Sequence, residues 1–189
     1  MADCMATAKT GTFYLTGVVT LPAANPSGSA GRVTSEIDLS AYVNVPTGQA
    51  IAIREVDFIY QTGTDMGSDV VTMLAGNGAV TSQLTDLNAG GQFVRADDQS
   101  LVASGSLNID QGNCIASHAS DLYPDNFGPA TLSEAFICVN DTLYLTAGTD
   151  NSAVGATVLN ITVRVRAQVV KLSTKDWMAV AIQSTASDN

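Results

Sequence analysis

The stretch LNITVRVRAQVVKL, residues 159–172, alternates between apolar and polar side chains over most of its length. Successive side chains of a β-strand point to opposite faces of a sheet, so this pattern predicts a long, half-buried strand with one polar face. The apolar parity should face a hydrophobic core. Its members are Ile161, Val163, Val165, Ala167 and Val169.

Four of the chain's eight basic residues lie in or just after this stretch: Arg164, Arg166, Lys171 and Lys175. A basic cluster can contact nucleic acid, but the chain has a net charge of −10 and a pI of about 4.1. An acidic surface repels phosphate backbones, so we expect no direct nucleic-acid binding. We interpret Arg164 and Arg166, which share the polar parity, as partners of acids on a neighbouring strand or subunit. Both are candidate subunit-interface residues.

A short helix is predicted directly after this strand. Ser173 and Asp176 have the spacing of a capping box, with Asp in place of the usual Glu or Gln. Apolar residues then recur from Trp177 to Ile182, enough for two or three helical turns. We expect Trp177 to dock against the body of the protein or against an adjacent subunit, which makes it the third candidate interface residue.

The rest of the chain consists of β-like runs separated by Gly, Asn, Asp, Pro and Ser. Hairpins are predicted at Gly76-Asn77-Gly78 and at Asn140-Asp141, and residues 114–129 are predicted to be an irregular connection. With eight to ten strands and one helix, the pattern predicts an all-β antiparallel sandwich that forms a single domain over residues 1–189. The predicted strands cover residues 12–20, 32–45, 50–60, 70–74, 79–84, one or two within 92–110, 134–139, 142–146 and 159–172.

Few residues suggest chemistry. The only histidine, His118, is expected in a solvated loop, no G-x-S-x-G motif is present, and a His-cluster metal site needs two or more histidines. Asp121 and Asp125 form the best calcium candidate, although ordinary turn acids explain them more simply. We therefore predict a protein that is not an enzyme and that has no catalytic residues, cofactor or metal.

The three cysteines, Cys4, Cys114 and Cys138, cannot form a closed disulfide framework, and their spacing does not match a metal site. A bridge between Cys114 and Cys138 is one reading, and buried free thiols are the favoured one. The N-terminus lacks a signal-peptide pattern and no stretch approaches the ~20 apolar residues of a membrane span, so a soluble protein is expected.

The succession of about eight strands, the loop-rich middle and the closing strand at residues 159–172 together resemble single jelly-roll capsid proteins. The resemblance implies two four-stranded antiparallel sheets packed face to face, with loops at the ends of the sandwich contacting other subunits. Many coat proteins of small RNA viruses carry a basic N-terminal arm, whereas the first 31 residues here contain Lys9 as their only base. This departure favours the capsid proteins of tailless icosahedral, membrane-containing DNA viruses.

The function implied by this resemblance is that of a structural protein that self-assembles into a viral capsid shell. Its partners would be copies of itself and other capsid proteins, with a viral lipid membrane nearby. The protein would be made in the host cytoplasm and would end in the virion. The low share of charged residues, 14% against a usual ~25%, agrees with faces that meet other subunits. The alternatives are a phage decoration or surface-filament subunit, and a receptor- or carbohydrate-binding module.

Overall fold

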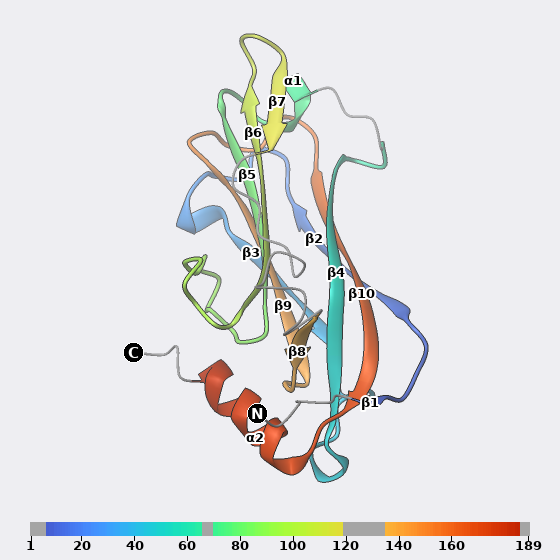
Figure 1. Cartoon of the computed structure of the whole chain (residues 1–189). Helices are drawn as coiled ribbons and strands as arrows, with labels where there is room; N and C mark the ends of the chain where they lie inside the picture. Colours follow the sequence, from blue (N-terminus) through green and yellow to red (C-terminus); the bar gives the residue numbers. More distant parts are fainter. Residues whose placement is uncertain (1–6, 66–69, 119–134, 186–189) are drawn as a thin grey trace.

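Two five-stranded antiparallel sheets pack face to face in the computed structural model, which describes residues 7–65, 70–118 and 135–185 (Figure 1). The strands of sheet A are β1 (Thr7–Ala8), β2 (Phe13–Leu21), β4 (Gln49–Thr62), β8 (Phe136–Cys138) and β10 (Leu159–Lys171). The strands of sheet B are β3 (Val33–Asp38), β5 (Gly78–Thr85), β6 (Leu101–Asp110), β7 (Ile115–His118) and β9 (Thr142–Asp150). The helical elements are α1 (Val70–Met73), α2 (Thr174–Thr185), and the 3-10 turns η1 (Ser29–Gly31) and η2 (Val45–Thr47).

The order of the strands is that of a jelly roll. Without the short strands β1 and β7, sheet A has the order β2-β10-β4-β8 and sheet B the order β3-β9-β5-β6. The eight strands thus pair in a nested way: β2 with β10, β3 with β9, β4 with β8, and β5 with β6. Such nesting arises when one long hairpin is rolled into two sheets. The predicted fold class is confirmed.

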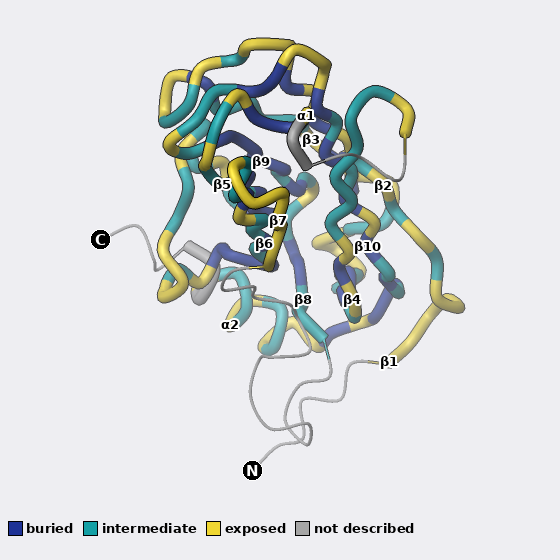
Figure 2. The backbone as a smooth tube through the Cα atoms, turned by 90° about the horizontal axis from the view of Figure 1, so that it is seen from above, coloured by how far each residue is buried: buried dark blue, intermediate teal, exposed yellow. Residues whose placement is uncertain are grey.

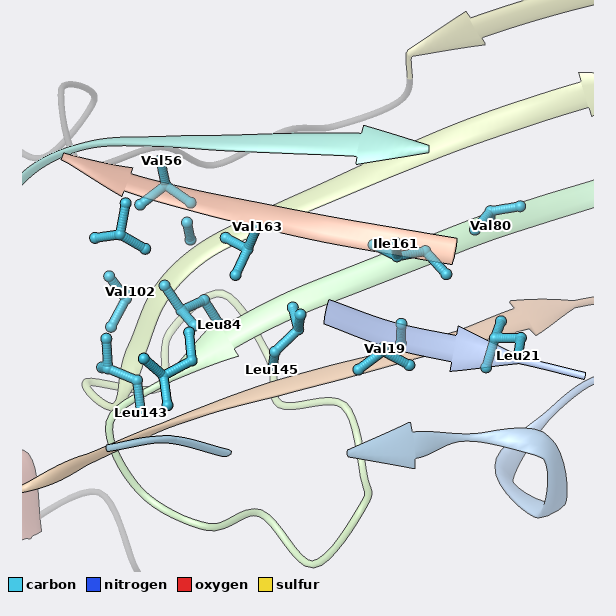
Figure 3. Close-up of a cluster of buried hydrophobic side chains, with 14 of the residues drawn as sticks. Val19, Leu21, Val56, Val80, Leu84, Val102, Leu143, Leu145, Ile161 and Val163 are labelled. Carbon is cyan, nitrogen blue, oxygen red and sulfur yellow. The ribbon is translucent and has the colours of Figure 1, made fainter. Parts of the chain in front are cut away.

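The hydrophobic core lies between the two sheets. Seen along the sandwich, the buried stretches of both layers face each other and the exposed stretches lie outside them or in the end loops (Figure 2). Side chains such as Ile161 and Val163 of β10 project toward Leu84 and Leu145 of sheet B (Figure 3). The apolar parity of the opening stretch is buried throughout, as predicted: Ile161, Val163, Val165 and Ala167 are 0% exposed and Val169 is 4% exposed.

A β-bulge in β4 changes which residues of that strand face the core. Arg166 of β10 lies opposite Glu55, but the next residue, Ala167, lies opposite Ile53, so Arg54 has no position in the register. Ile53 and Val56 are consequently both buried in the core, although in a regular strand residues three positions apart would point to opposite faces. The bulge explains why neither parity of this strand is purely polar in the sequence.

Two of the strand predictions are wrong in type or extent. Residues 70–73 of the predicted strand at residues 70–74 form α1, so no hairpin is centred on Gly76-Asn77-Gly78. The predicted strand over residues 32–45 ends at Asp38, where the Ser40 backbone N–H donates to the Asp38 carboxylate in a local turn. Within residues 92–110, β6 is the strand, and Phe93 and Val94 lie in a loop.

Two connections also differ from expectation. The strands on either side of Asn140-Asp141, β8 and β9, do not form a hairpin, because β8 pairs with β4 in sheet A while β9 belongs to sheet B. The segment predicted as an irregular connection begins with the strand β7, which pairs with β6. The remainder of that segment, from residue 119, lies outside the described residues.

Candidate interaction surface

The outer surface of sheet A is built by the polar parity of β10 and the residues that flank it. In cross-strand register, Arg166 lies between Tyr14 of β2 and Glu55 of β4, and Arg164 lies between Thr16 and Asp57. Two further rows of uncharged residues continue the surface. We call this surface the sheet A face. It consists of Tyr14, Thr16, Val18, Thr20, Glu55, Asp57, Ile59, Gln61, Asn160, Thr162, Arg164 and Arg166.

Both arginines predicted to lie on the polar face do so. Arg166 Nε is 3.0 Å from Glu55 Oε2, and the guanidinium carbon of Arg164 is 5.1 Å from the centre of the Tyr14 ring. The acid beside Arg166 therefore belongs to a neighbouring strand of the same chain. Because the side chains of Arg166 and Glu55 are 42% and 49% exposed, this ion pair contributes at most about 1 kcal/mol. The charges remain accessible to a partner, and their role at a subunit interface stays a prediction.

Apolar side chains are exposed along one edge of this face, on β2. Tyr14 is 57% exposed and Val18 is 50% exposed. Their neighbours in the ladder are mostly hydroxyl and amide side chains, and Thr20 Oγ1 donates a hydrogen bond of 2.8 Å to Asn160 Oδ1. A sheet surface with exposed aromatic and aliphatic groups among polar groups has the composition of protein–protein contact surfaces.

Helix α2 covers the other end of the outer surface of sheet A. Ser173 caps it: the Ser173 hydroxyl donates to Asp176 Oδ2 at 2.6 Å, and the Asp176 backbone N–H donates to Ser173 Oγ at 3.2 Å. Trp177 packs against the buried cluster that includes Ala50 and Ala52, two small residues of β4 on the N-terminal side of the bulge. The predicted cap by Ser173 and the docking of Trp177 on the body are confirmed, whereas Asp176 accepts from the Ser173 hydroxyl and not from its backbone N–H, as it would in a full capping box. A contact of Trp177 with another subunit stays a prediction.

The outer surface of sheet B is instead covered by the loop of residues 86–100. Gln83 of β5 holds this loop through two hydrogen bonds with the backbone of Val94, one donated by its Nε2 at 2.9 Å and one accepted by its Oε1 at 2.8 Å. The Arg32 guanidinium lies 4.2 Å from the centre of the Phe93 ring. The chain thus buries part of one sheet surface with its own loop and exposes apolar groups on the other.

Residues that could carry chemistry are dispersed. His118 ends the strand β7 and does not lie in the predicted loop. No group of three or more His, Cys, Asp or Glu side chains within residues 7–65, 70–118 and 135–185 could hold a metal ion. Asp121 and Asp125 lie outside the described residues. None of the helices in the described ranges is long and apolar enough to cross a bilayer.

The two cysteines in the described ranges are free thiols, so they do not bridge. Cys138 is buried as expected, and burial, together with the nearby Asp86 carboxylate, raises the pKa of its thiol to about 12. The expectation of a buried thiol is wrong for Cys114, which is exposed in the turn between β6 and β7. Cys114 has a φ of 54°, because the tight turn needs a left-handed residue there. Cys4 lies outside the described residues.

Comparison with known proteins gives similarity at the level of three-dimensional structure. No protein-family model matches the chain, and no curated protein matches it in sequence. A VP1 chain from an unassembled pentamer of Washington University Polyomavirus is 9% identical, with 89% of this chain and 99% of that chain covered and a TM-score of 0.44. VP1 of Trichodysplasia spinulosa-associated polyomavirus is 10% identical, with 87% and 98% covered and a TM-score of 0.41.

A semi-empty virus-like particle of the Macrobrachium rosenbergii nodavirus contains a chain that is 11% identical, with 89% of this chain and 97% of that chain covered. Its TM-score is 0.31. Because the TM-scores of these virus structures are below 0.5, the assignment of the jelly roll rests on the nested strand order of this chain.

Proposed function

We propose that this protein is a structural subunit that assembles with copies of itself, and with other capsid proteins, into the shell of a virus particle. The role is non-catalytic, and the location is the virion. The resemblance described above extends the proposal to a tailless, membrane-containing DNA virus, in which the shell stands near a lipid membrane. The protein would be made in the host cytoplasm.

The observation that carries the proposal is the sheet A face, with its exposed Tyr14 and Val18. A fold does not fix a function, so a jelly roll alone would leave the role open. A sheet surface that exposes apolar side chains is suited to repeated contact with an identical partner. Protein–protein interfaces combine apolar and aromatic side chains with polar ones.

The dimensions of the face indicate what else must take part. Four rows along a strand span roughly 20 Å, and three strands span roughly 10 Å between the outer two. This area is smaller than the ~800 Å² per partner of a standard interface. The face would therefore form part of the contact, and the outward side of α2, where Met178 and Ile182 are 56% and 62% exposed, would complete it.

Assembly can be tested directly on the purified protein. Size-exclusion chromatography with light scattering should give species larger than a monomer, and negative-stain microscopy should show regular particles. A monomer at all concentrations, in both low and high salt, would contradict the proposal. Saturable glycan binding by such a monomer would instead support the binding-module alternative.

A pair of matched variants tests the role of the sheet A face. Val18→Asp places a charge on the apolar β2 edge of the face and should abolish the large species while leaving the thermal unfolding transition in place. Val45→Asp introduces the same charge at a residue of similar exposure, 58% against 50%, in the turn η2 away from the face. It should assemble as the wild type does. Equal assembly of both variants would exclude this face from the contact.

A further inference from the structure

Strand β2 leaves one long edge of sheet A open. Its nine residues pair with β10 on one side, and within the described residues no strand pairs with β2 on the other side. Proteins usually protect an open edge with charged residues, with proline or by keeping the edge strand short. At the other edges of the two sheets, β3 carries Glu36 and Asp38, and β7 and β8 have only four and three residues. The sequence of β2, FYLTGVVTL, has no charge and no proline, so this edge is both long and unprotected.

The hydrogen bonds of β10 show which backbone groups of β2 point to the open edge. The Lys9 N–H donates to the Val169 carbonyl at 2.9 Å on the side of β10 where β2 lies, whereas the Leu172 N–H donates to the Gly48 carbonyl at 2.8 Å on the side of β4. Backbone groups alternate between the two sides of a strand, so the odd-numbered residues of β10 bond to β2. Their partners in the register are the odd-numbered residues of β2. The even-numbered residues of β2 therefore direct their N–H and C=O groups outward.

These outward-directed residues are Tyr14, Thr16, Val18 and Thr20, and all four are exposed. Their backbone groups make no hydrogen bond to another loop or strand among the described residues. The next even-numbered residue, Pro22, has no N–H, so the row of donors ends at Thr20. The edge thus offers four donors and four acceptors at the spacing that an antiparallel strand requires.

We infer that this edge pairs with β2 of a second copy, antiparallel and about a two-fold axis beside Gly17. In this register Tyr14 lies opposite the partner's Thr20, and Thr16 lies opposite the partner's Val18. Each of the four pairs exchanges two hydrogen bonds, about eight in all, which is within the ~5–15 of a protein–protein interface. A shift by two residues in either direction would place one of the outward-directed residues opposite a residue outside β2. The contact rests on the proposed self-assembly and specifies one of its steps.

The sequence of β2 suits pairing with itself. At the axis Gly17 meets the partner's Gly17 in a pair without hydrogen bonds, where opposite residues come closest. On the outer surface, Tyr14 gains the partner's Thr20 as a neighbour, and Val18 gains the partner's Thr16. Cross-strand pairs of aromatic and β-branched residues stabilise sheets. The two copies of sheet A become one continuous sheet with both sheet A faces on the same side, and this closed, two-fold contact leaves those faces to further partners.

Engineered cysteines test the register. In a chain that carries Cys4→Ser and Cys114→Ser, the variant Tyr14→Cys/Thr20→Cys places thiols opposite each other across the contact. Their Cα atoms would be about 5.5 Å apart, within the range of a disulfide. The same two positions lie roughly 20 Å apart within one strand, so a bridge cannot form inside one chain. Mild oxidation should convert most of this variant to a covalent dimer on a non-reducing gel.

The single-cysteine variants are the controls. Tyr14→Cys alone and Thr20→Cys alone should remain monomers on the same gel, because each cysteine would lie roughly 20 Å from its counterpart in the second copy. Both positions are exposed in β2, so the two controls have the same access to oxidant as the double variant.

Two replacements of Val18 separate the strand edge from the apolar side chain. Val18→Pro remains apolar but removes the N–H that bonds to the partner's Thr16. Proline is tolerated where the N–H of an edge strand faces solvent, so the thermal unfolding transition should persist. The two-fold contact loses two hydrogen bonds, and association should need a protein concentration at least about tenfold higher in sedimentation velocity. Val18→Thr keeps the N–H and the branched shape, and it should weaken association less.

Three results would overturn the inference. The first is the absence of a covalent dimer of the double-cysteine variant although the wild type assembles. The second is a covalent dimer of either single-cysteine variant, which would indicate a different contact. The third is association of Val18→Pro at the wild-type concentration. In each case the wild type assembles and the proposed function stands. A covalent dimer of the double variant without any larger wild-type species would instead support the β2 contact and contradict the proposed shell.

Discussion

Replacing Gly105 by alanine should destabilise the protein, because two aromatic residues occupy the space that the methyl group would need. Gly105 lies in β6, and a Cβ there would be 2.8 Å from Cδ2 of Phe58 and 3.2 Å from the hydroxyl of Tyr60, both on β4 of the opposite sheet. The Tyr60 hydroxyl is held in place by Ser82 Oγ at 2.8 Å. The ring of Phe58 must therefore move, or the sheets must separate.

Two opposing effects determine the size of the change. Overpacking of a core costs about 1–3 kcal/mol. Replacing glycine by alanine stabilises by about 0.4–1 kcal/mol, because the unfolded chain loses conformational freedom. The crowding should prevail, and we expect the free energy of unfolding to fall by about 1–2 kcal/mol. For a chain of this size, the melting temperature should then fall by about 2–8 °C.

Urea unfolding of a double-mutant cycle measures this crowding directly. Phe58→Leu removes the ring edge that the new methyl group would strike. The double variant should be more stable than the sum of the single changes predicts, by at least about 0.5 kcal/mol. Gly11→Ala is the control, since no atom lies within 4 Å of its added Cβ, and it should change stability little. Wild-type stability of Gly105→Ala, or strict additivity with Phe58→Leu, would refute the reasoning.

Further changes test other features of the protein. Val165→Asp buries an unpaired carboxylate at a site that is 0% exposed and should abolish folding. Arg166→Ala should leave the circular dichroism spectrum intact and weaken assembly, as measured by light scattering. Unaltered assembly of Arg166→Ala would contradict the interface role of this residue. Ser173→Ala should lower the free energy of unfolding in urea by about 1 kcal/mol and should alter the fluorescence of Trp177, the only tryptophan. If neither changes, the hydrogen bonds of Ser173 do not support α2. In the folded protein, Cys114 should react with a thiol reagent at pH 8 and Cys138 should not, as mapped by mass spectrometry. The pKa of Cys138 is raised from 9.0 to about 12, so on raising the pH the thiol loses its proton in the unfolded state before it does in the folded state. The free energy of unfolding should therefore fall as the pH rises above about 9. A Cys138→Ala variant whose free energy of unfolding falls equally with pH would exclude this cause.

The sequence predicts the features of this fold that depend on local periodicity. The alternation in residues 159–169 correctly indicates both the strand β10 and its buried face, since the pattern survives wherever one side of a strand meets the core. The spacing of Ser173 and Asp176 likewise indicates the start of α2, because a capping box involves only neighbouring residues. The polar parity of β10 also predicts where Arg164 and Arg166 project.

Features that depend on distant residues were not predictable in the same way. The run at residues 70–74 is rich in β-branched side chains, which favour strands, yet tertiary contacts place it in a single helical turn. The turn signal at Asn140-Asp141 is local, whereas the distribution of β8 and β9 over two sheets depends on partners far along the chain. The bulge at Arg54 leaves a trace in the sequence, since the buried parity of β4 changes there, and a search for such a change could have located it.

The position of β10 has a consequence for how the protein is made. This strand is the last along the described chain, yet it lies within sheet A, where it joins β2 and β1 on one side to β4 on the other. Until residues up to Lys171 have emerged from the ribosome, no strand joins β2 to β4, and sheet A stays incomplete. The arginines of the sheet A face are synthesised with the same strand. A nascent chain therefore lacks the proposed contact surface, so subunits that assemble through it would meet only after translation of this segment, when their strands are already paired.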